Sequence, residues 1–351
     1  MSFLLLQASP SVDWFTLVMG ILAGLVLFLL GVDKLAHGFQ ILAGDRLKTW
    51  LGRFTTNRFR GLVSGTVVTA VLDSSSVTII MLITLVHAGL ITFVQALGVI
   101  LGSNIGTTIG SQIIAFEIHA YAPIAMLAGF GMYLLAPSER VKAIGEVTLG
   151  FGLLFFGLGT LGGAVEPLRD YPAFLSLMEG LGDRPIIGAL IGALATVVLQ
   201  SSSATVGIAI TMAMSGIMPL SSGIAVLLGA EVGTVANTVV ATIGRSREAV
   251  RAALFHFFFN ATTVILGLLL VNQLVAFAEW SAPGAGAARQ IANAHVFFNV
   301  AGALLFLPLL GPAAKALLWL VPASDPASED ASSEDASIPE EEVDIEEETA
   351  P

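Results

Sequence analysis

Two runs of three serines are the strongest candidates for binding chemistry in this chain. Each run follows one polar residue, in Asp73-Ser74-Ser75-Ser76 and in Gln200-Ser201-Ser202-Ser203. A single serine in an apolar helix usually bonds back to a carbonyl of its own helix or holds two helices together. Two equal runs, each in the middle of an apolar segment, favour a common site instead. Hydroxyl groups and the backbone N–H groups at the start of a helix can together bind an anion.

The composition indicates that most of the chain is solvated by lipid. Of the 351 residues, 55% are hydrophobic and only 12% are charged, whereas a soluble domain carries about 25% charged residues. This excludes an ordinary cytosolic enzyme. The absence of cysteine excludes disulfides, thiolate metal sites and thiol catalysis.

The net charge of −11 describes the end of the chain and not its folded part. Twelve of the 26 acidic residues lie between 325 and 348, and no basic residue follows Lys315. Segment 322–351 is rich in Ser, Ala, Pro, Asp and Glu and has no aromatic residue, so it is predicted to be a disordered acidic tail.

Several apolar segments are long enough to be membrane-spanning helices, since about 20 helical residues cross a hydrocarbon core of about 30 Å. The first runs from Trp14 to Ala43, and we interpret it as a retained helix rather than a cleaved signal. The segment from Pro312 to Val321 is too short to span and is expected at the membrane interface. Further spans are predicted near 121–136, 143–161, 249–271 and 291–310.

The two segments that carry the serine runs do not fit a simple spanning helix. Gly61 to Leu72 gives about 18 Å of helix, which ends midway across the membrane, directly before Asp73. One continuous helix would expose this polar cluster to lipid at a high cost. The alternative is a half-helix, a turn and a second half-helix, all buried in protein. We expect this re-entrant, discontinuous arrangement at both runs.

The same two segments form an internal repeat. An offset of 127 residues superimposes 61–110 on 188–237 without a gap, and 17 of the 50 positions are identical. Both serine runs coincide, as do the pairs Gly102 with Gly229 and Gly106 with Gly233. Apolar bias alone does not align such landmarks, so the chain is predicted to consist of two related halves.

Loop charges predict that the halves have opposite orientations. Linker 45–60 carries five basic residues and one acidic residue, whereas linker 164–185 carries two basic and four acidic residues. Basic loops favour the cytoplasmic side. We therefore predict an all-α polytopic membrane protein with two inverted-topology repeats, an arrangement that places a substrate site near the midplane.

The paired motifs resemble those of type II sodium-dependent phosphate cotransporters. These motifs are Gln200-Ser201-Ser202-Ser203-Ala204-Thr205, its partner Ser74-Ser75-Ser76-Val77-Thr78, and Gly102-Ser103-Asn104-Ile105-Gly106-Thr107-Thr108. Members of that family carry two inverted repeats, each with a QSSS and a G-S/A-N-I-G-T motif. The resemblance covers residues 17–310. The chain departs from the pattern twice, because Asp73 replaces the first glutamine and Glu231 replaces the second asparagine.

The resemblance implies a sodium-coupled transporter that takes up inorganic phosphate by alternating access, and not an enzyme. The implied phosphate-binding residues are Ser74, Ser75, Ser76, Gln200, Ser201, Ser202 and Ser203. The oxygen donors expected at sodium are Asp73, Thr78, Asn104, Thr107, Thr205, Glu231 and Thr234. No cofactor other than sodium as the coupling ion is expected. The expected partners are phosphate, sodium and the lipid bilayer of a bacterial inner membrane, with no nucleic acid and an unidentified partner for the tail.

The two carboxylates leave the ion coupling open. A carboxylate at membrane depth must be paired, protonated or bound to a cation. Asp73 and Glu231 could each bind sodium, exchange a proton, or stay neutral and bond to a nearby serine. We favour the cation role for Asp73. Histidines 87, 256 and 295 share no evident spacing and are expected to be packing residues.

Three other functions compete with sodium-coupled phosphate uptake. The first is transport of another oxyanion, such as sulfate or arsenate, or proton coupling. The second is intramembrane hydrolysis by a catalytic serine, which would need one serine beside one base; no basic residue recurs beside the serine runs. The third is a membrane scaffold that uses the tail. In every case the predicted organisation is an N-terminal segment 1–13, repeat regions 14–163 and 164–321, and tail 322–351.

Overall fold

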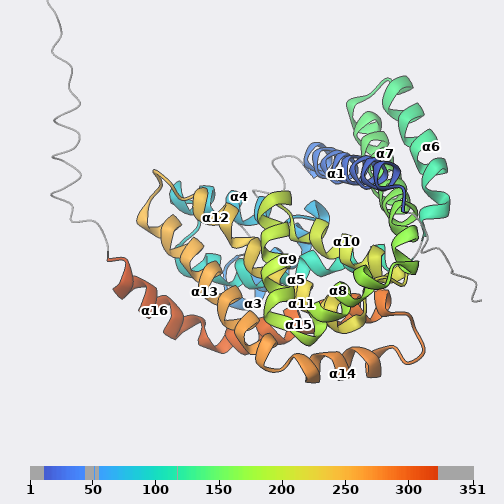
Figure 1. The fold of residues 1–351 in the computed structure, drawn as a ribbon. Coiled ribbons are helices and arrows are strands. Elements are labelled where there is room, and N and C mark those ends of the chain that lie inside the picture. Colours follow the sequence, from blue (N-terminus) through green and yellow to red (C-terminus); the bar gives the residue numbers. More distant parts are fainter. Residues whose placement is uncertain (1–11, 44–50, 52–54, 117, 323–351) are drawn as a thin grey trace, which may run out of the picture.

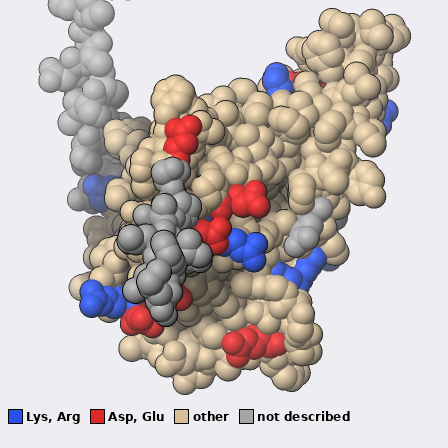
Figure 2. All heavy atoms as spheres, turned by 45° about the vertical axis from the view of Figure 1, so that its right-hand side comes forward, with Lys and Arg blue, Asp and Glu red and all other residues tan. Residues whose placement is uncertain are grey.

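The computed structural model describes residues 12–43, 51, 55–116 and 118–322 as an all-helical structure (Figure 1). The predicted N-terminal segment and acidic tail lie almost entirely outside the described residues, as do much of linker 45–60 and Glu117. Seven helical segments among the described residues are long and apolar enough to cross a membrane. Lys, Arg, Asp and Glu are sparse on the face drawn in Figure 2, as expected for a surface that contacts lipid.

Three helices form a group at one end of the molecule (Figure 1). They are α1 (Trp14–Ala43), α6 (Ala122–Leu135) and α7 (Glu139–Val165). Gly24 and Gly31 of α1 lie directly against the backbone of α7, where a Cβ would collide. Small residues drive such close approach in membranes, where burial in lipid supplies no hydrophobic force between helices. Buried Glu146 of α7 adds an ion pair with Lys34 at 2.7 Å.

The predicted interruptions are confirmed in both repeats. The first repeat contains α3 (Arg58–Leu72), α4 (Ser75–His87) and α5 (Phe93–Ile114). The second contains α9 (Pro185–Leu199), α10 (Ser202–Met214), α11 (Leu220–Gly233) and the short α12 (Val235–Val240). In each repeat, one half-helix ends and the next begins at the serine run.

The remaining helices connect and surround the repeats. Helix α8 (Pro172–Asp183) precedes α9 and is bent from it by 104°. After the second repeat come α13 (Arg247–Leu269), α14 (Val271–Ser281), α15 (Ala287–Phe306) and α16 (Leu310–Leu320). Short 3-10 turns lie at Ile118–Tyr121 (η1), Glu166–Asp170 (η2) and Leu307–Leu309 (η3). The long spans predicted from the sequence are therefore present as helices.

The first re-entrant pair opens toward the face that carries the loop before α13. The end of α4 contacts that loop, because the backbone N–H of Ser246 donates to Nδ1 of His87 at 3.0 Å. Helix α3 runs parallel to α5, with Gly65 against Val99 and Gly106 against Thr69. Since α5 begins just after α4 ends, α3 also begins at this face.

The second re-entrant pair opens toward the opposite face. Ser215, just after α10, lines the same cavity as Ile114 at the end of α5. Helix α5 crosses the membrane between α4's end and this cavity, so α4 and α10 end on opposite sides. Helix α9 runs parallel to α11, with Gly192 against Val226. The inverted-topology prediction is therefore confirmed by the packing.

Labelling of single cysteines tests this topology directly. Thr56, just before α3, and Ser176, in α8, are both exposed, and the chain has no native cysteine. By the distribution of basic loops, we expect an impermeant thiol reagent to reach Thr56→Cys only from the cytoplasmic side and Ser176→Cys only from the outside. Labelling of both variants from one side would contradict the inverted arrangement.

Candidate substrate and ion site

Each serine run follows a residue in the left-handed backbone conformation. Asp73 has φ 46° and ψ 30°, and Gln200 has φ 54° and ψ 24°. They are the only non-glycine residues with positive φ in the described part of the chain. This conformation costs an L-residue roughly 1–2 kcal/mol, and it reverses the chain between the two half-helices. Equal geometry at positions 127 residues apart shows that the repeat extends to the backbone of the breaks.

The first serine of each run caps the second half-helix. The Ser74 hydroxyl accepts from the N–H of Val77 at 3.2 Å, and the Ser201 hydroxyl accepts from the N–H of Ala204 at 3.1 Å. These bonds satisfy backbone donors that lipid could not satisfy. Ser74 and Ser201 therefore have a structural role in addition to any contact with a ligand.

A pair of threonines joins the two half-helices at each break. Thr69 donates to the hydroxyl of Thr78 at 2.9 Å, and Thr196 donates to that of Thr205 at 2.8 Å. Thr78 and Thr205 in turn donate to the carbonyls of the capping serines. The equivalent bonds hold both breaks in the same shape.

The two breaks meet at the centre of the molecule. The Ser203 hydroxyl, in the second repeat, donates to the carbonyl of Asp73, in the first repeat, at 3.4 Å. Ser75, Ser202 and Ser203 are buried. The hydroxyls of Ser75, Ser76 and Ser202 make no hydrogen bond to any described residue. The predicted grouping of the serines is thus a real spatial cluster that retains donors for a ligand.

Gln200 takes a different position from the one its type suggests. Its carbonyl accepts from Asn237 at 3.1 Å, while its side chain is exposed. No contact links the side-chain amide to the serines among the described residues. The sequence places Gln200 correctly at the break, but a role for its amide at phosphate stays a prediction.

Asp73 lies beside the break, with its carboxylate directly against Gly110 of α5. It is half-buried and lines a cavity of about 340 Å³ between the repeat and helices α1 and α7. Among the described residues it has no ion-pair partner. A carboxylate in this setting is available to a cation.

The second motif of each repeat packs against the first half-helix of its own repeat. Gly102 lies on the carbonyl of Leu62 so closely that any Cβ would collide with it. Buried Asn104 donates to the carbonyl of Ile100 at 2.9 Å. Thr107 and Thr234 likewise bond to carbonyls of their own helices, four residues earlier. Their oxygens remain able to accept or to coordinate, so their predicted sodium role is untested by this geometry.

Glu231 has partners that the sequence did not indicate. His295 of α15 places Nε2 2.8 Å from Oε1 of Glu231, and Asn299 donates to the same oxygen at 3.0 Å. The other nitrogen of His295, Nδ1, lies 2.7 Å from the hydroxyl of Ser111 in the first repeat. His295 is fully buried and Glu231 is 4% exposed. One histidine therefore connects the two repeats through the unusual carboxylate.

A second histidine occupies the equivalent position on α13. Nδ1 of His256 lies 3.0 Å from the hydroxyl of Thr238, which is the residue 127 positions after Ser111. Nε2 of His256 is buried without a hydrogen-bond partner. The sequence carries the signal twice, as His-x-Phe-Phe-Asn at 256–260 and 295–299. The expectation that these histidines share no pattern is wrong, since this repeat has a spacing of 39 and not 127.

Comparison with known proteins agrees with this architecture. The sequence model of the Na+/Pi-cotransporter family matches residues 27–163 and 171–306, which is most of the chain and includes both repeats. "Uncharacterized protein YqeW" of Bacillus subtilis is 29% identical over 299 residues, which is 85% of this chain and 96% of that protein.

Two further relatives have printed functions. "Putative inorganic phosphate export protein YjbB" of Escherichia coli is 26% identical over 296 residues, covering 84% of this chain and 54% of that protein, so this chain spans about half of its length. Human "Sodium-dependent phosphate transport protein 2B" is 32% identical over 136 residues, 36% of this chain and 20% of that protein. No solved structure matches the chain significantly. With both serine-bearing repeats inside the matched regions, this multi-pass membrane protein belongs to the Na+/Pi-cotransporter family, a family of phosphate transporters and not of enzymes.

Proposed function

We propose that this protein is a sodium-coupled transporter that takes up inorganic phosphate by alternating access. The observation that carries the proposal is the meeting of the two serine-bearing breaks, joined by the bond from Ser203 to the Asp73 carbonyl. Inverted repeats with broken helices at the midplane are the architecture of many secondary transporters.

Phosphate would bind between the starts of α4 and α10. The N-terminus of a helix carries about half a positive charge and free N–H groups. The unpaired hydroxyls of Ser75, Ser76 and Ser202 would add neutral donors. Because such a site holds an anion without a fixed basic side chain, release on the other side of the membrane is not opposed by a strong ion pair.

Sodium would bind to oxygen atoms near the breaks and on α5 and α11. Asp73, Thr78 and Thr205 lie at the breaks, while Asn104, Thr107, Glu231 and Thr234 are the proposed donors on α5, on α11 and at the end of α11. In Glu231, Oε1 already accepts two bonds, so Oε2 is the atom left for a cation. Each sodium ion that moves inward supplies about 2.3 kcal/mol per 100 mV of membrane potential.

Export of phosphate is the second candidate, because the printed name of the relative YjbB describes export. Both directions would use the same site. The direction depends on the ion gradients and on the coupling, so one reconstituted system can measure both.

The decisive measurement is phosphate flux in proteoliposomes. We expect an inward sodium gradient to accelerate uptake of labelled phosphate, and an equal potassium gradient at the same clamped voltage to have no effect. Sulfate and arsenate as competitors test the substrate. Flux that ignores sodium in either direction would refute sodium coupling, and an absence of phosphate flux would refute phosphate transport.

Ser202→Ala tests the phosphate site. A hydrogen bond to a charged group contributes about 1.5–3 kcal/mol, so we expect the KM for phosphate to rise by roughly tenfold or more. Ser201→Ala is the control, since loss of an N-cap costs about 1 kcal/mol of stability and should lower the Tm. An unchanged KM in Ser202→Ala would remove this hydroxyl from the phosphate site.

Asp73→Asn tests the cation role of the first break. We expect the apparent sodium affinity to fall by roughly tenfold, equal to about 1.4 kcal/mol, while the protein remains folded and inserted. Asp183→Asn in exposed α8 is the matched control and should behave like the unchanged protein. If Asp73→Asn keeps its sodium affinity and its pH profile, Asp73 binds neither sodium nor an exchanging proton.

A further inference from the structure

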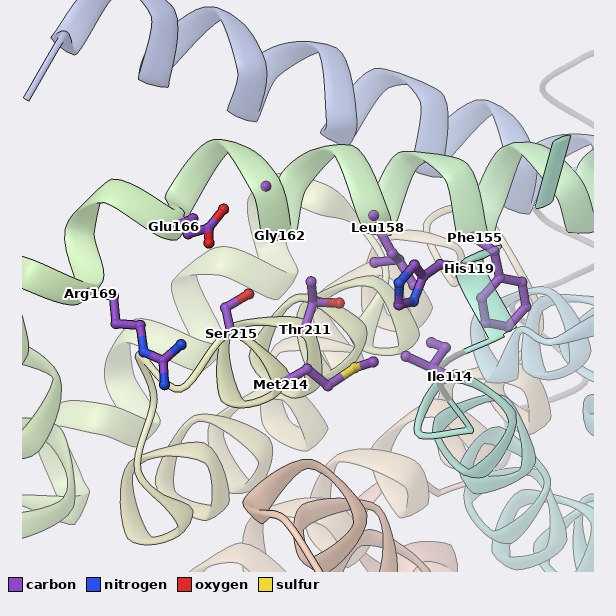
Figure 3. Close-up of a pocket in the computed structure, with 12 residues that line it drawn as sticks. Ile114, His119, Phe155, Leu158, Gly162, Glu166, Arg169, Thr211, Met214 and Ser215 are labelled. Carbon is purple, nitrogen blue, oxygen red and sulfur yellow. The ribbon is translucent and has the colours of Figure 1, made fainter. Parts of the chain in front are cut away.

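Two cavities lie one after the other along a single face of α7. The outer cavity, of about 330 Å³, is lined by Leu158, Gly162 and Glu166 at the end of α7 and by residues of α10 and η2 (Figure 3). The inner cavity, of about 340 Å³, is lined by Val147 and Phe151 and reaches Asp73. The α7 residues follow a helical spacing of three or four, so one stripe of α7 forms a wall of both cavities.

The cavities meet at Ile114 and Phe155, which line both of them. Ile114 lies at the end of α5 and Phe155 in the middle of α7, and they are only 5% and 3% exposed. Figure 3 shows the two side chains together at one end of the outer cavity, with Glu166 and Arg169 toward the other. We call Ile114 and Phe155 the gate.

The polar groups along this path differ at its two ends. The outer cavity has charges of both signs, from His119, Glu166 and Arg169. The inner cavity is apolar except for Asp73 and Thr148. A passage that ends at a lone carboxylate between apolar walls attracts cations and repels anions.

We propose that the cavities form the route by which a monovalent cation reaches Asp73 from the outer face, with Ile114 and Phe155 as its gate. The proposal deepens the sodium coupling proposed above and rests on it. It separates the cation's path from the serine cluster, where the helix N-termini favour the anion. Opening of the gate would connect the outer solution to Asp73 without displacing the serines.

Cysteine accessibility tests the path without any transport measurement. Gly163 lines the outer cavity and has no atom within 4 Å of an added Cβ, so Gly163→Cys should be tolerated. Thr148→Cys reports on the inner cavity. Thr160→Cys is the matched control, since both threonines lie on α7 and bond to carbonyls four residues earlier, but Thr160 lines neither cavity.

Cationic and anionic methanethiosulfonates of similar size are added to the outside of sealed vesicles. We expect Gly163→Cys to react with both reagents, and Thr148→Cys to react slowly while Phe155 is present. Adding Phe155→Ala should raise the rate at Thr148→Cys at least tenfold for the cationic reagent and much less for the anionic one. Ile114→Ala should act in the same direction, and an unchanged rate at Gly163→Cys verifies the fold of both gate variants.

Three results would overturn the proposal. The first is failure of Gly163→Cys to react from outside. The second is a rate at Thr148→Cys that neither gate variant raises above that of Thr160→Cys. The third is equal acceleration by both reagents, which would make the passage unselective for charge. Since none of these readouts involves phosphate, a failed path and a failed phosphate transporter give different results.

Discussion

The need to satisfy backbone hydrogen bonds far from water governs this structure. A chain that reverses in the middle of a membrane leaves N–H and C=O groups that lipid cannot pair. Here, a capping serine and a pair of threonines satisfy part of this need at each break, with the same bonds in both repeats. Helices α5 and α11, which pack on α3 and α9, are the most buried of the seven candidate spans and separate the breaks from lipid. The glycines of α5 and α11 permit this contact because a side chain would collide with the facing carbonyls.

The same requirement explains how the repeats are linked outside the breaks. His295 bonds to Ser111 of the first repeat and to Glu231 of the second, with Asn299 as an additional donor. Removing one partner of a buried charged pair typically costs 3–5 kcal/mol, because the remaining charge has no solvent. The His-x-Phe-Phe-Asn helices α13 and α15 therefore act as supports that hold the repeats together, and they do not copy the repeats' own sequence.

The parts of this structure that could be predicted from the sequence are those with a local or strictly periodic signal. The break after Leu72 follows from the length of the apolar run, and the equivalence of Asp73 and Gln200 follows from a constant offset. The partner of Glu231 could not be found in this way, because His295 belongs to a helix outside the repeat. Likewise, Lys34 and Glu146 are separated by 112 residues, and no pattern in either helix indicates that they meet. Sequence periodicity thus predicts which elements form, whereas contacts between elements of different origin depend on the tertiary packing.

The two departures from the family motif are unequal once their surroundings are compared. Glu231 replaces an amide, but His295 and Asn299 occupy one of its oxygens, so its surroundings compensate the change. Asp73 replaces an amide beside a cavity, and no described residue neutralises it. The second half therefore gains a carboxylate together with its partner, whereas the first half gains one that is open to the path along α7. An inverted repeat that is symmetric in its backbone is in this way asymmetric in its electrostatics, and the first break is the place where a cation has most to gain by binding.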